Sequence, residues 1–519
     1  MSVLKANTDF SIRKWFSKTF FQEKLNNPIG YGIGIAIALG LAFVLTALPL
    51  KLGMMVVLGM IGIPIVLYCF ADLHFGIIVL LSMGFFLSLI GKFVNAPIGT
   101  AVDGILLLLL FGLLVRLVKE RDFSFVKSPI TIFILIWIYY NFIEVLNPWA
   151  QSRMAWIYTV RTVALYLAVY FVAAHAMNSL ARVKSVLKAV ICLALLSALY
   201  SLKQEFFGYS QAELVWLHSD PKRFELIFQW GRLRVFSFFS DPTTFGMLMA
   251  YMSVFCMVLI IWGKKKWQRI ALTFATICMF MGMAFAGSRT PFVLVPTGVL
   301  FFMLLTFKRE TMIVGIGMVL FIAVFSLKST SNPIIFRIQS AFKPSADGSV
   351  QVRLDNQTRV QPFVQSHPIG AGLGSTGMWG KRFTPNSWLA SFAHDSLYVR
   401  IAVEAGWIGL IIYMLLTFIA LKQGIYYFFR VKDPEIKSLY LAVTTVVFIL
   451  AVANYPQEAV TLPPTSMIFY VFLAVLVRLK DFDENFKKEE EEERDLTIPV
   501  FSNPQKSKAL AVFDSKIQK

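Results

Sequence analysis

Fourteen apolar runs long enough to cross a lipid bilayer divide most of this 519-residue chain. A helix needs about 20 predominantly apolar residues to span roughly 30 Å of hydrocarbon. The chain is also 57% hydrophobic and only 15% charged, whereas soluble globular chains are about 25% charged. These features predict an all-α, polytopic integral membrane protein of about 14 transmembrane helices. The expected spans are residues 30–50, 52–72, 75–91, 98–118, 129–146, 154–176, 186–206, 242–262, 268–286, 291–307, 311–327, 402–421, 438–455 and 465–479.

The distribution of basic residues predicts the orientation of these spans. Cytoplasmic loops of membrane proteins are enriched in Lys and Arg. If the basic N-terminal segment lies in the cytoplasm, nearly every later inside loop is basic, whereas the short outside loops carry one basic residue or none. We therefore expect both termini in the cytoplasm. The net charge of +19 is then explained mostly by the basic residues of the cytoplasmic loops. Because the basic residues are scattered over many loops, they do not indicate nucleic-acid binding.

The loops divide the chain into three expected regions. Residues 1–29 form a cytoplasmic segment, residues 30–480 form the membrane domain, and residues 481–519 form a charged, disordered cytoplasmic tail. Two outside loops are long, at about 207–241 and 328–401, and the second is too large to be a mere connector. Large loops on the outer side indicate a functional site that faces outward.

Three segments place charged or polar residues where an outside loop leads into a span. They are Arg234–Phe245, Gly287–Pro291 and Ala393–Leu410. Pro242 after Asp241, and Pro291 after Thr290, have the pattern of a capped helix start. Helix N-termini offer free N–H groups that suit phosphate, and an arginine adds a planar, permanently charged clamp. Arg234 and Arg289 are therefore candidate phosphate ligands, although each alone could equally be an arginine anchored at the membrane surface.

Histidine is scarce, and among the five only His394 stands at the start of a span. Histidine is the commonest general base near neutral pH, so His394 is either such a base or a hydrogen-bonded structural residue. Two further ionisable residues, Asp103 and Arg161, lie at similar depth within two spans. Charges inside a membrane usually pair or line a cavity. We expect an Asp103–Arg161 ion pair, with Arg161 in a polar cavity as the alternative.

The large outside loop contains Gly370, Gly372 and Gly374, a G-x-G-x-G pattern without the strand and helix of a dinucleotide-binding fold. A tight turn is the simplest interpretation, and a backbone cradle for phosphate is the alternative. No outward-facing cluster of carboxylates or histidines has metal-ligand spacing, and all four cysteines lie within spans. The sequence therefore predicts neither a metal nor another cofactor.

These segments together resemble the O-antigen ligase and polysaccharide polymerase superfamily. The matching stretches are G-S-R-T-P, the loop sequence R-L-D-N-Q-T-R-V-Q-P-F-V-Q-S-H-P-I-G-A-G-L-G-S, and A-H-D-S-L-Y followed by E-A-G-W-I-G-L. Their order and spacing agree with the family, and the large outer loop lies in the expected place. The resemblance covers roughly residues 150–450, and the hydrophobic layout extends it to the whole chain.

The resemblance implies a GT-C-like fold and metal-independent glycosyl transfer on the outer face of the bacterial inner (cytoplasmic) membrane. The donor would be a glycan on a polyprenyl diphosphate, such as undecaprenyl diphosphate. The acceptor hydroxyl would lie on lipid A-core for a ligase, or on a growing glycan for a polymerase.

In this scheme Arg234 and Arg289 would hold the diphosphate and His394 would accept the proton of the hydroxyl. Other charged residues in or near the matched segments would support them, namely Arg161, Asp103, Arg353, Arg359 and Glu404. A polysaccharide transporter or flippase is the alternative from another class. It would need charges spread through the depth of the membrane, whereas here they cluster at the outer side.

Overall fold

The computed structural model describes residues 28–48, 50–93, 98–121, 124–229, 231–263, 265–307, 348–392 and 394–484, together with a few isolated positions. The chain forms two compact units, Met1–Tyr68 and Cys69–Lys519. The described part of the first unit holds α2 (Pro28–Ala47) and most of α3 (Leu50–Ala71). All the features considered below lie in the second unit.

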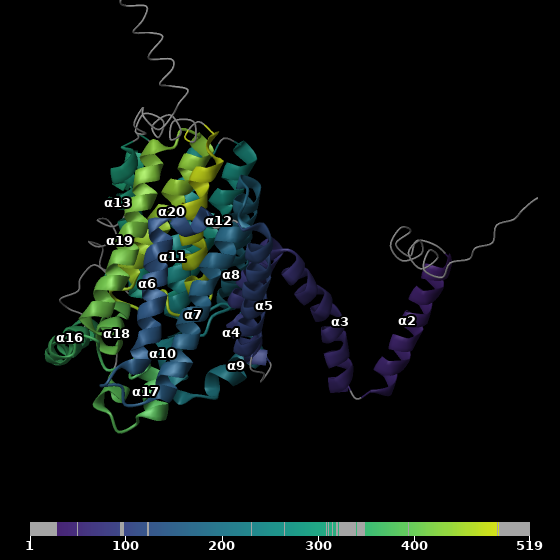
Figure 1. Cartoon of the computed structure of the whole chain (residues 1–519), viewed down its shortest axis with the longest axis horizontal. Helices are drawn as coiled ribbons and strands as arrows, with labels where there is room; N and C mark the ends of the chain where they lie inside the picture. Colours follow the sequence, from purple (N-terminus) through teal and green to yellow (C-terminus); the bar gives the residue numbers. More distant parts are fainter. Residues whose placement is uncertain are drawn as a thin grey trace, which may run out of the picture. The chain divides into compact units, whose positions relative to one another are not determined.

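Helices make up almost all of the described second unit, and most of them run side by side in one bundle (Figure 1). The only strands described are β1 (Phe228–Gln229) and β2 (Arg232–Leu233), an antiparallel pair in which Phe228 faces Leu233. The helices are α4 (Leu73–Phe93), α5 (Ile98–Glu120), η2 (Ser124–Lys127), α6 (Pro129–Ile143), η3 (Glu144–Leu146), α7 (Arg153–Ala176), α8 (Leu180–Phe207), α9 (Gln211–His218), α10 (Pro221–Ile227), α11 (Pro242–Trp262), α12 (Lys266–Ala286), α13 (Arg289–Thr306), α16 (Gly348–Ser366), α17 (Gly377–Phe383), η5 (Trp388–Ser391), α18 (Leu397–Glu404), α19 (Gly406–Arg430), α20 (Pro434–Ala453), α21 (Thr465–Arg478) and η6 (Leu479–Phe482).

Ten helices in the described part of the chain are long and apolar enough to cross a membrane: α4, α5, α6 with η3, α7, α8, α11, α12, α13, α19 and α20. This confirms the prediction of an all-α, polytopic membrane protein. Helices α2, α3 and α21 lie at three further expected spans. The expected span at 311–327 lies largely outside the described residues, so the count of fourteen stays a prediction.

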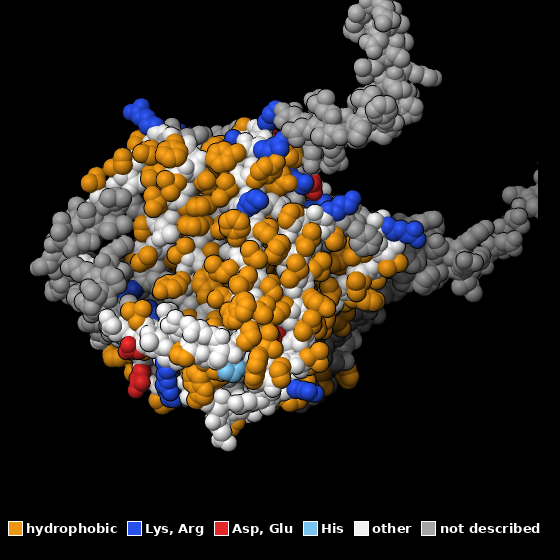
Figure 2. Space-filling model, turned by 60° about the vertical axis from the view of Figure 1, so that its left-hand side comes forward, with side chains coloured by type: hydrophobic (Ala, Val, Ile, Leu, Met, Phe, Trp, Pro, Cys, Tyr) orange, Lys and Arg blue, Asp and Glu red, His pale blue; other side chains and the backbone are white. Residues whose placement is uncertain are grey.

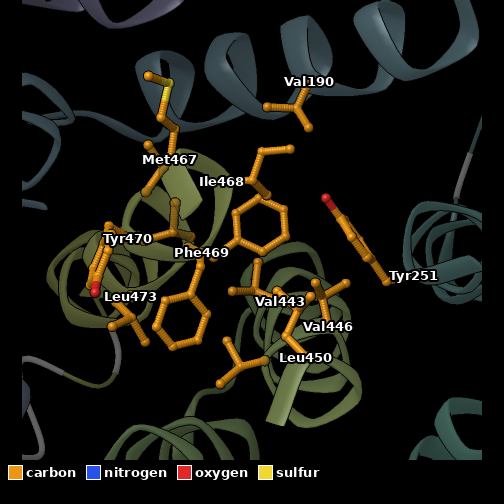
Figure 3. Packing of buried hydrophobic residues seen from close by; sticks show 14 of the residues in the cluster. Val190, Tyr251, Val443, Val446, Leu450, Met467, Ile468, Phe469, Tyr470 and Leu473 are labelled. Carbon is orange, nitrogen blue, oxygen red and sulfur yellow. The ribbon is translucent and has the colours of Figure 1, made fainter. Parts of the chain in front are cut away.

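The centre of the bundle is formed by α11, α20 and α21, which are apolar on every side. Figure 3 shows Tyr251 of α11 facing Val446 of α20, with Ile468 and Phe469 of α21 packed between them and Val190 of α8. The outer helices instead expose large apolar side chains, as lipid contact requires. Figure 2 shows such side chains over most of the visible face; exposed examples in the bundle are Phe111, Ile132, Leu135, Phe274, Leu304 and Phe418.

The three expected helix starts differ in detail. Asp241 caps α11 as predicted, because its carboxylate accepts hydrogen bonds from the amides of Thr243 and Thr244. The prediction for α13 was wrong by two residues: the helix begins at Arg289 and not at Pro291, and its N-cap, Ser288, makes no side-chain capping bond. Of these two helix starts, only that of α13 therefore lacks a side chain over its first amides.

The third segment breaks into two helices instead of entering one span. Helix α18 ends at Glu404, and α19 begins at Gly406, whose φ of +70° suits only glycine. A Cβ at Gly406 would lie 2.0 Å from the carbonyl oxygen of Pro368, and one at Gly370 would lie 2.5 Å from the amide nitrogen of Gly406. The P-I-G and E-A-G stretches thus pack backbone against backbone. The expected span at 402–421 is corrected to 406–430.

The G-x-G-x-G segment is a tight turn, as its simplest interpretation predicted. Gly370 donates to the carbonyl of His367, Ala371 donates to that of Val403, and Ser375 donates to that of Gly372. Because these amides already have protein acceptors, they are not available as a phosphate cradle.

One basic residue expected on a short outside loop, Lys92, instead lies buried in the last turn of α4. Its ammonium donates to the carbonyl of Ser237 at 3.0 Å and lies over the rings of Phe236 and Trp216. Such a cation is stabilised by the ring faces in a site that excludes water. Through these contacts Lys92 holds the loop that carries Arg234 against the end of α4.

Candidate active site

The described helices in and after the large loop, α16, α17 and α18, lie together at one end of the bundle (Figure 1). A cavity of about 540 Å³ opens among α6, α7, α17, α18 and the loop before α21. Its wall is mostly apolar and aromatic, with a few polar and charged groups. His394, the candidate base, and Glu404 both lie on this wall. The cavity is thus the place where the sequence motifs and a ligand-sized space coincide.

His394 is held in place by a carboxylate that the sequence did not single out. Its ring nitrogen Nδ1 contacts Glu458, which comes from the loop between α20 and α21. The other nitrogen, Nε2, is buried and has no hydrogen-bond partner within the described residues. A Cβ at Gly377 would lie only 3.3 Å from Nε2, so the absence of a side chain there leaves room beside this nitrogen. A carboxylate at Nδ1 favours the proton on that nitrogen, which leaves the lone pair on Nε2 free to accept one.

Glu458 belongs to a buried network of charges on the cavity wall. Burial alone would raise the pKa of Glu458, but the contact with His394 and the charge of Arg400 outweigh it and hold that pKa below its ordinary value. Arg400 donates to Glu458 at 2.9 Å and lies 3.4 Å from Glu404, one turn further along α18. Although burial opposes the charged form, these two carboxylates raise the pKa of Arg400. Glu458 is therefore an anion at neutral pH, and Arg400 is already paired.

Arg234 braces the turn that precedes α13. Its guanidinium donates to the carbonyl of Ala286 at 3.0 Å, to the hydroxyl of Ser288 and to the carbonyl of Leu226. Burial lowers the pKa of Arg234 to about 10, Asp241 opposes this effect, and the charge of Arg289 adds to it. Arg234 thus lies close to Arg289, but its donors are directed at the protein.

Arg289 and Arg353 connect this turn with the cavity. Arg353, on α16, is near enough to Arg289 for their charges to interact. Its Nε also lies 3.3 Å from the carboxylate of Asp395, the residue that follows His394. Arg353 is thus held beside the segment of the candidate base, and Arg289 of another helix lies near Arg353. Two neighbouring arginines suit a multiply charged anion. Arg359 lies one to two turns further along α16, over the ring of Trp388.

The expected ion pair between Asp103 and Arg161 is present, with 3.7 Å between the charged groups. Arg161 also lies beside the ring of Tyr158. Neither residue of the pair lines the cavity, although both charges act on Tyr166, which does. The pair is therefore a structural neighbour of the candidate site.

Sequence reasoning missed Glu458 and Arg400. Glu458 is an acidic residue in the short loop between the last two predicted spans, and the expected orientation of such loops depends on basic residues alone. Arg400 lies within the A-H-D-S-L-Y-V-R stretch, four residues before Glu404, and this spacing places both on one face of a helix. A search for charge pairs across the outer loops could have found both.

Similarity to known proteins agrees with this geometry. A family model described as O-Antigen ligase matches residues 274–414, which include Arg289, Arg353, His394 and Glu404. The matched region is thus similar to the O-antigen ligase and polymerase superfamily. A curated O-antigen polymerase from Salmonella muenchen is 26% identical over 191 residues, which cover 35% of this chain and 45% of that relative. The chain thus spans less than half the length of this superfamily relative.

Proposed function

We propose that the protein is an O-antigen ligase-like glycosyltransferase that moves a glycan from a polyprenyl-diphosphate carrier to an acceptor hydroxyl. The hydroxyl oxygen attacks the anomeric carbon of the donor sugar, and the bond from that carbon to the diphosphate oxygen breaks. The diphosphate leaves with the bonding electrons. Nε2 of His394 takes the proton of the hydroxyl, while Glu458 stabilises the charged ring. The observation that carries this proposal is the unpaired Nε2 of a histidine whose other nitrogen faces a buried anion.

The diphosphate needs positive charge as it leaves, and Arg289 with Arg353 would supply it. Arg353 contacts Asp395, the neighbour of His394, and Arg289 is near enough to Arg353 for their charges to interact. The N-terminus of α13 has no side-chain cap over its first amides. Preorganised donors aimed at developing charge are a large source of rate enhancement in enzymes. Arg234 would hold the turn that presents Arg289 and act on the diphosphate through its charge.

Polymerase activity is the second candidate, since the Salmonella relative is named an O-antigen polymerase whereas the matching family is described as O-Antigen ligase. The acceptor differs: lipid A-core for a ligase, a growing glycan for a polymerase. The glycan profile of a deletion strain separates the two. A ligase mutant accumulates full-length chains on the carrier lipid, and a polymerase mutant accumulates single repeat units. An unchanged profile would contradict both.

We propose the bacterial inner membrane as the location, with both termini in the cytoplasm and the cavity on the outer face. Residues 30–480 would form the catalytic membrane domain, and residues 481–519 a cytoplasmic tail. The asymmetry of Lys and Arg among the loops supports this orientation. Reporter fusions after Lys266 and Lys480 should then read cytoplasmic, and fusions near Gly348 should read extracytoplasmic. A cytoplasmic signal at Gly348 would put the cavity on the wrong face for a lipid-linked glycan.

The Glu458→Gln substitution should lower turnover on the order of 10²-fold, because a small misplacement of a catalytic group costs about that much. The substitution keeps the shape of the side chain and removes the anion facing His394. Donor affinity should stay the same. The measurement is turnover and donor affinity of the purified variant beside the wild type.

A matched control is Glu205→Gln, which removes the partner of Arg232 at 2.7 Å in another outer ion pair. The Glu205→Gln protein should keep wild-type turnover. Wild-type turnover in Glu458→Gln would show that the carboxylate has no role in the reaction.

Activity of the purified protein should survive EDTA. The proposed charges on the diphosphate come from arginine, and within the described residues no group of three or more His, Cys, Asp or Glu side chains could hold a metal ion. The measurement is transfer rate before and after chelation, with added Mg²⁺ and Mn²⁺. Loss of activity on chelation, reversed by either ion, would contradict a metal-independent mechanism.

A further inference from the structure

Several residues that line the 540 Å³ cavity each carry a buried side-chain atom with no hydrogen-bond partner within the described residues. These atoms are Asn141 Oδ1, Thr159 Oγ1, Thr461 Oγ1 and Nε2 of His394. Buried polar atoms are normally paired, and each unpaired one destabilises a fold. Four such atoms around a single cavity indicate that the cavity is shaped for a ligand with several hydroxyl groups.

Aromatic rings occupy the same wall. Trp137, Tyr166, Trp379 and Tyr413 all line the cavity. The position of Trp379 is fixed by stacking on Tyr158, with 4.6 Å between ring centroids. A sugar ring has one face of C–H groups that packs on an aromatic ring and a rim of hydroxyls that need hydrogen-bond partners. The cavity offers both kinds of surface.

We propose that this cavity is the binding site for the acceptor sugar that carries the attacking hydroxyl. This inference rests on the proposed function and adds the place and chemistry of the second substrate. The charged groups on the wall, Arg400, Glu404 and Glu458, are paired with one another and leave one net negative charge, so the site does not suit an anionic ligand such as a diphosphate. The arginines assigned to the diphosphate do not line the cavity. His394 borders both the cavity and a small depression formed with Arg353.

A polyprenyl chain is a poorer occupant of the same space. It would fill the apolar part of the wall but would leave the oxygens of Asn141, Thr159 and Thr461 buried against hydrocarbon, without partners. A cavity of about 540 Å³ lies in the range of roughly 300–1,000 Å³ that is usual for small-molecule sites. A short oligosaccharide therefore matches both its size and its polarity.

The test uses valine in place of threonine, which replaces a hydroxyl by a methyl group of the same shape. Thr159→Val and Thr461→Val alter the cavity. Thr444→Val is the matched control, because Thr444 is also buried with an unpaired hydroxyl but lies in α20 away from the cavity. All three variants should melt at the wild-type temperature or above, since each loses an unpaired polar atom.

Three probes are titrated against the full-length protein in detergent, with the melting temperature as the readout of binding. Two are oligosaccharides freed of lipid, the glycan repeat unit and the lipid A-core sugar, and the third is inorganic pyrophosphate. At least one oligosaccharide should raise the melting temperature of the wild type. Its affinity should fall about threefold to tenfold in Thr159→Val and Thr461→Val, as for one lost hydrogen bond, and stay unchanged in Thr444→Val. Pyrophosphate affinity should be the same in all four proteins.

The inference is overturned if oligosaccharide affinity is unchanged in both cavity variants, or if a short polyprenol displaces the oligosaccharide. Lower affinity for pyrophosphate in those variants would also overturn it, because the cavity would then hold the donor. Absence of any pyrophosphate response in the wild type, with oligosaccharide binding intact, would contradict the proposed donor and not the sugar site.

Discussion

The His394→Ala protein is expected to transfer glycan about 10²–10⁴-fold more slowly than the wild type, the usual loss for a general base. Its affinity for the lipid-linked donor should be unchanged, because the diphosphate would be held by arginines on α13 and α16 and not by the histidine. The measurement is turnover and donor affinity in membranes, with equal expression established first.

The control for this substitution is His218→Ala. His218 lies at the end of α9, between α8 and α11, where its exposed ring stacks on Phe224. The His218→Ala protein should keep wild-type turnover. If His394→Ala instead lost donor binding and kept turnover of the bound donor, His394 would be a ligand of the diphosphate and not the base.

The Arg289→Lys protein should lose about 10²-fold in transfer rate, the effect of removing one preorganised donor from a site of developing negative charge. Lysine keeps the charge but cannot offer two parallel N–H groups to a diphosphate. Donor affinity should fall as well, since the same group would hold the ground state. An arginine that only anchors the helix at the membrane surface would tolerate lysine.

Arg232→Lys is the matched control, because Arg232 of β2, two residues before Arg234, forms a partly buried ion pair with Glu205 of α8. A lysine can preserve that pair, so activity should be unchanged. Full activity of the Arg289→Lys protein would show that Arg289 does not clamp the diphosphate, even if the similarity to the superfamily holds.

Much of the fold could be predicted from the sequence because the bilayer imposes strong rules. Apolar length alone located the helices, for example α11 within 242–262 and α20 near 438–455. The apolar length of the segment gave the wrong start for α19, which begins at Gly406 and not at residue 402. The break there depends on the backbone of Pro368, which is distant in sequence, so no local pattern reports it.

The candidate site was predictable only in part. His394, Arg289 and Glu404 stood out because each lies in a short, distinctive stretch at a predicted helix start or end. Glu458 did not, because a single acidic residue in a short loop has meaning only once the fold brings it to His394. Arg234 was identified, but hydrogen bonds to Ala286 and Ser288 show that it supports the turn, a role that depends on three-dimensional packing.

The central claim is that the site around His394 transfers a glycan from polyprenyl diphosphate to a hydroxyl. The most direct measurement supplies the purified protein with the lipid-linked glycan of its own strain, labelled on the sugar, together with lipid A-core or a second lipid-linked repeat unit. We predict that label moves to one of these acceptors while free polyprenyl diphosphate is released in equal amount, and that His394→Ala abolishes both signals together. Release of neither product by the wild type, or equal transfer by His394→Ala, would contradict the account.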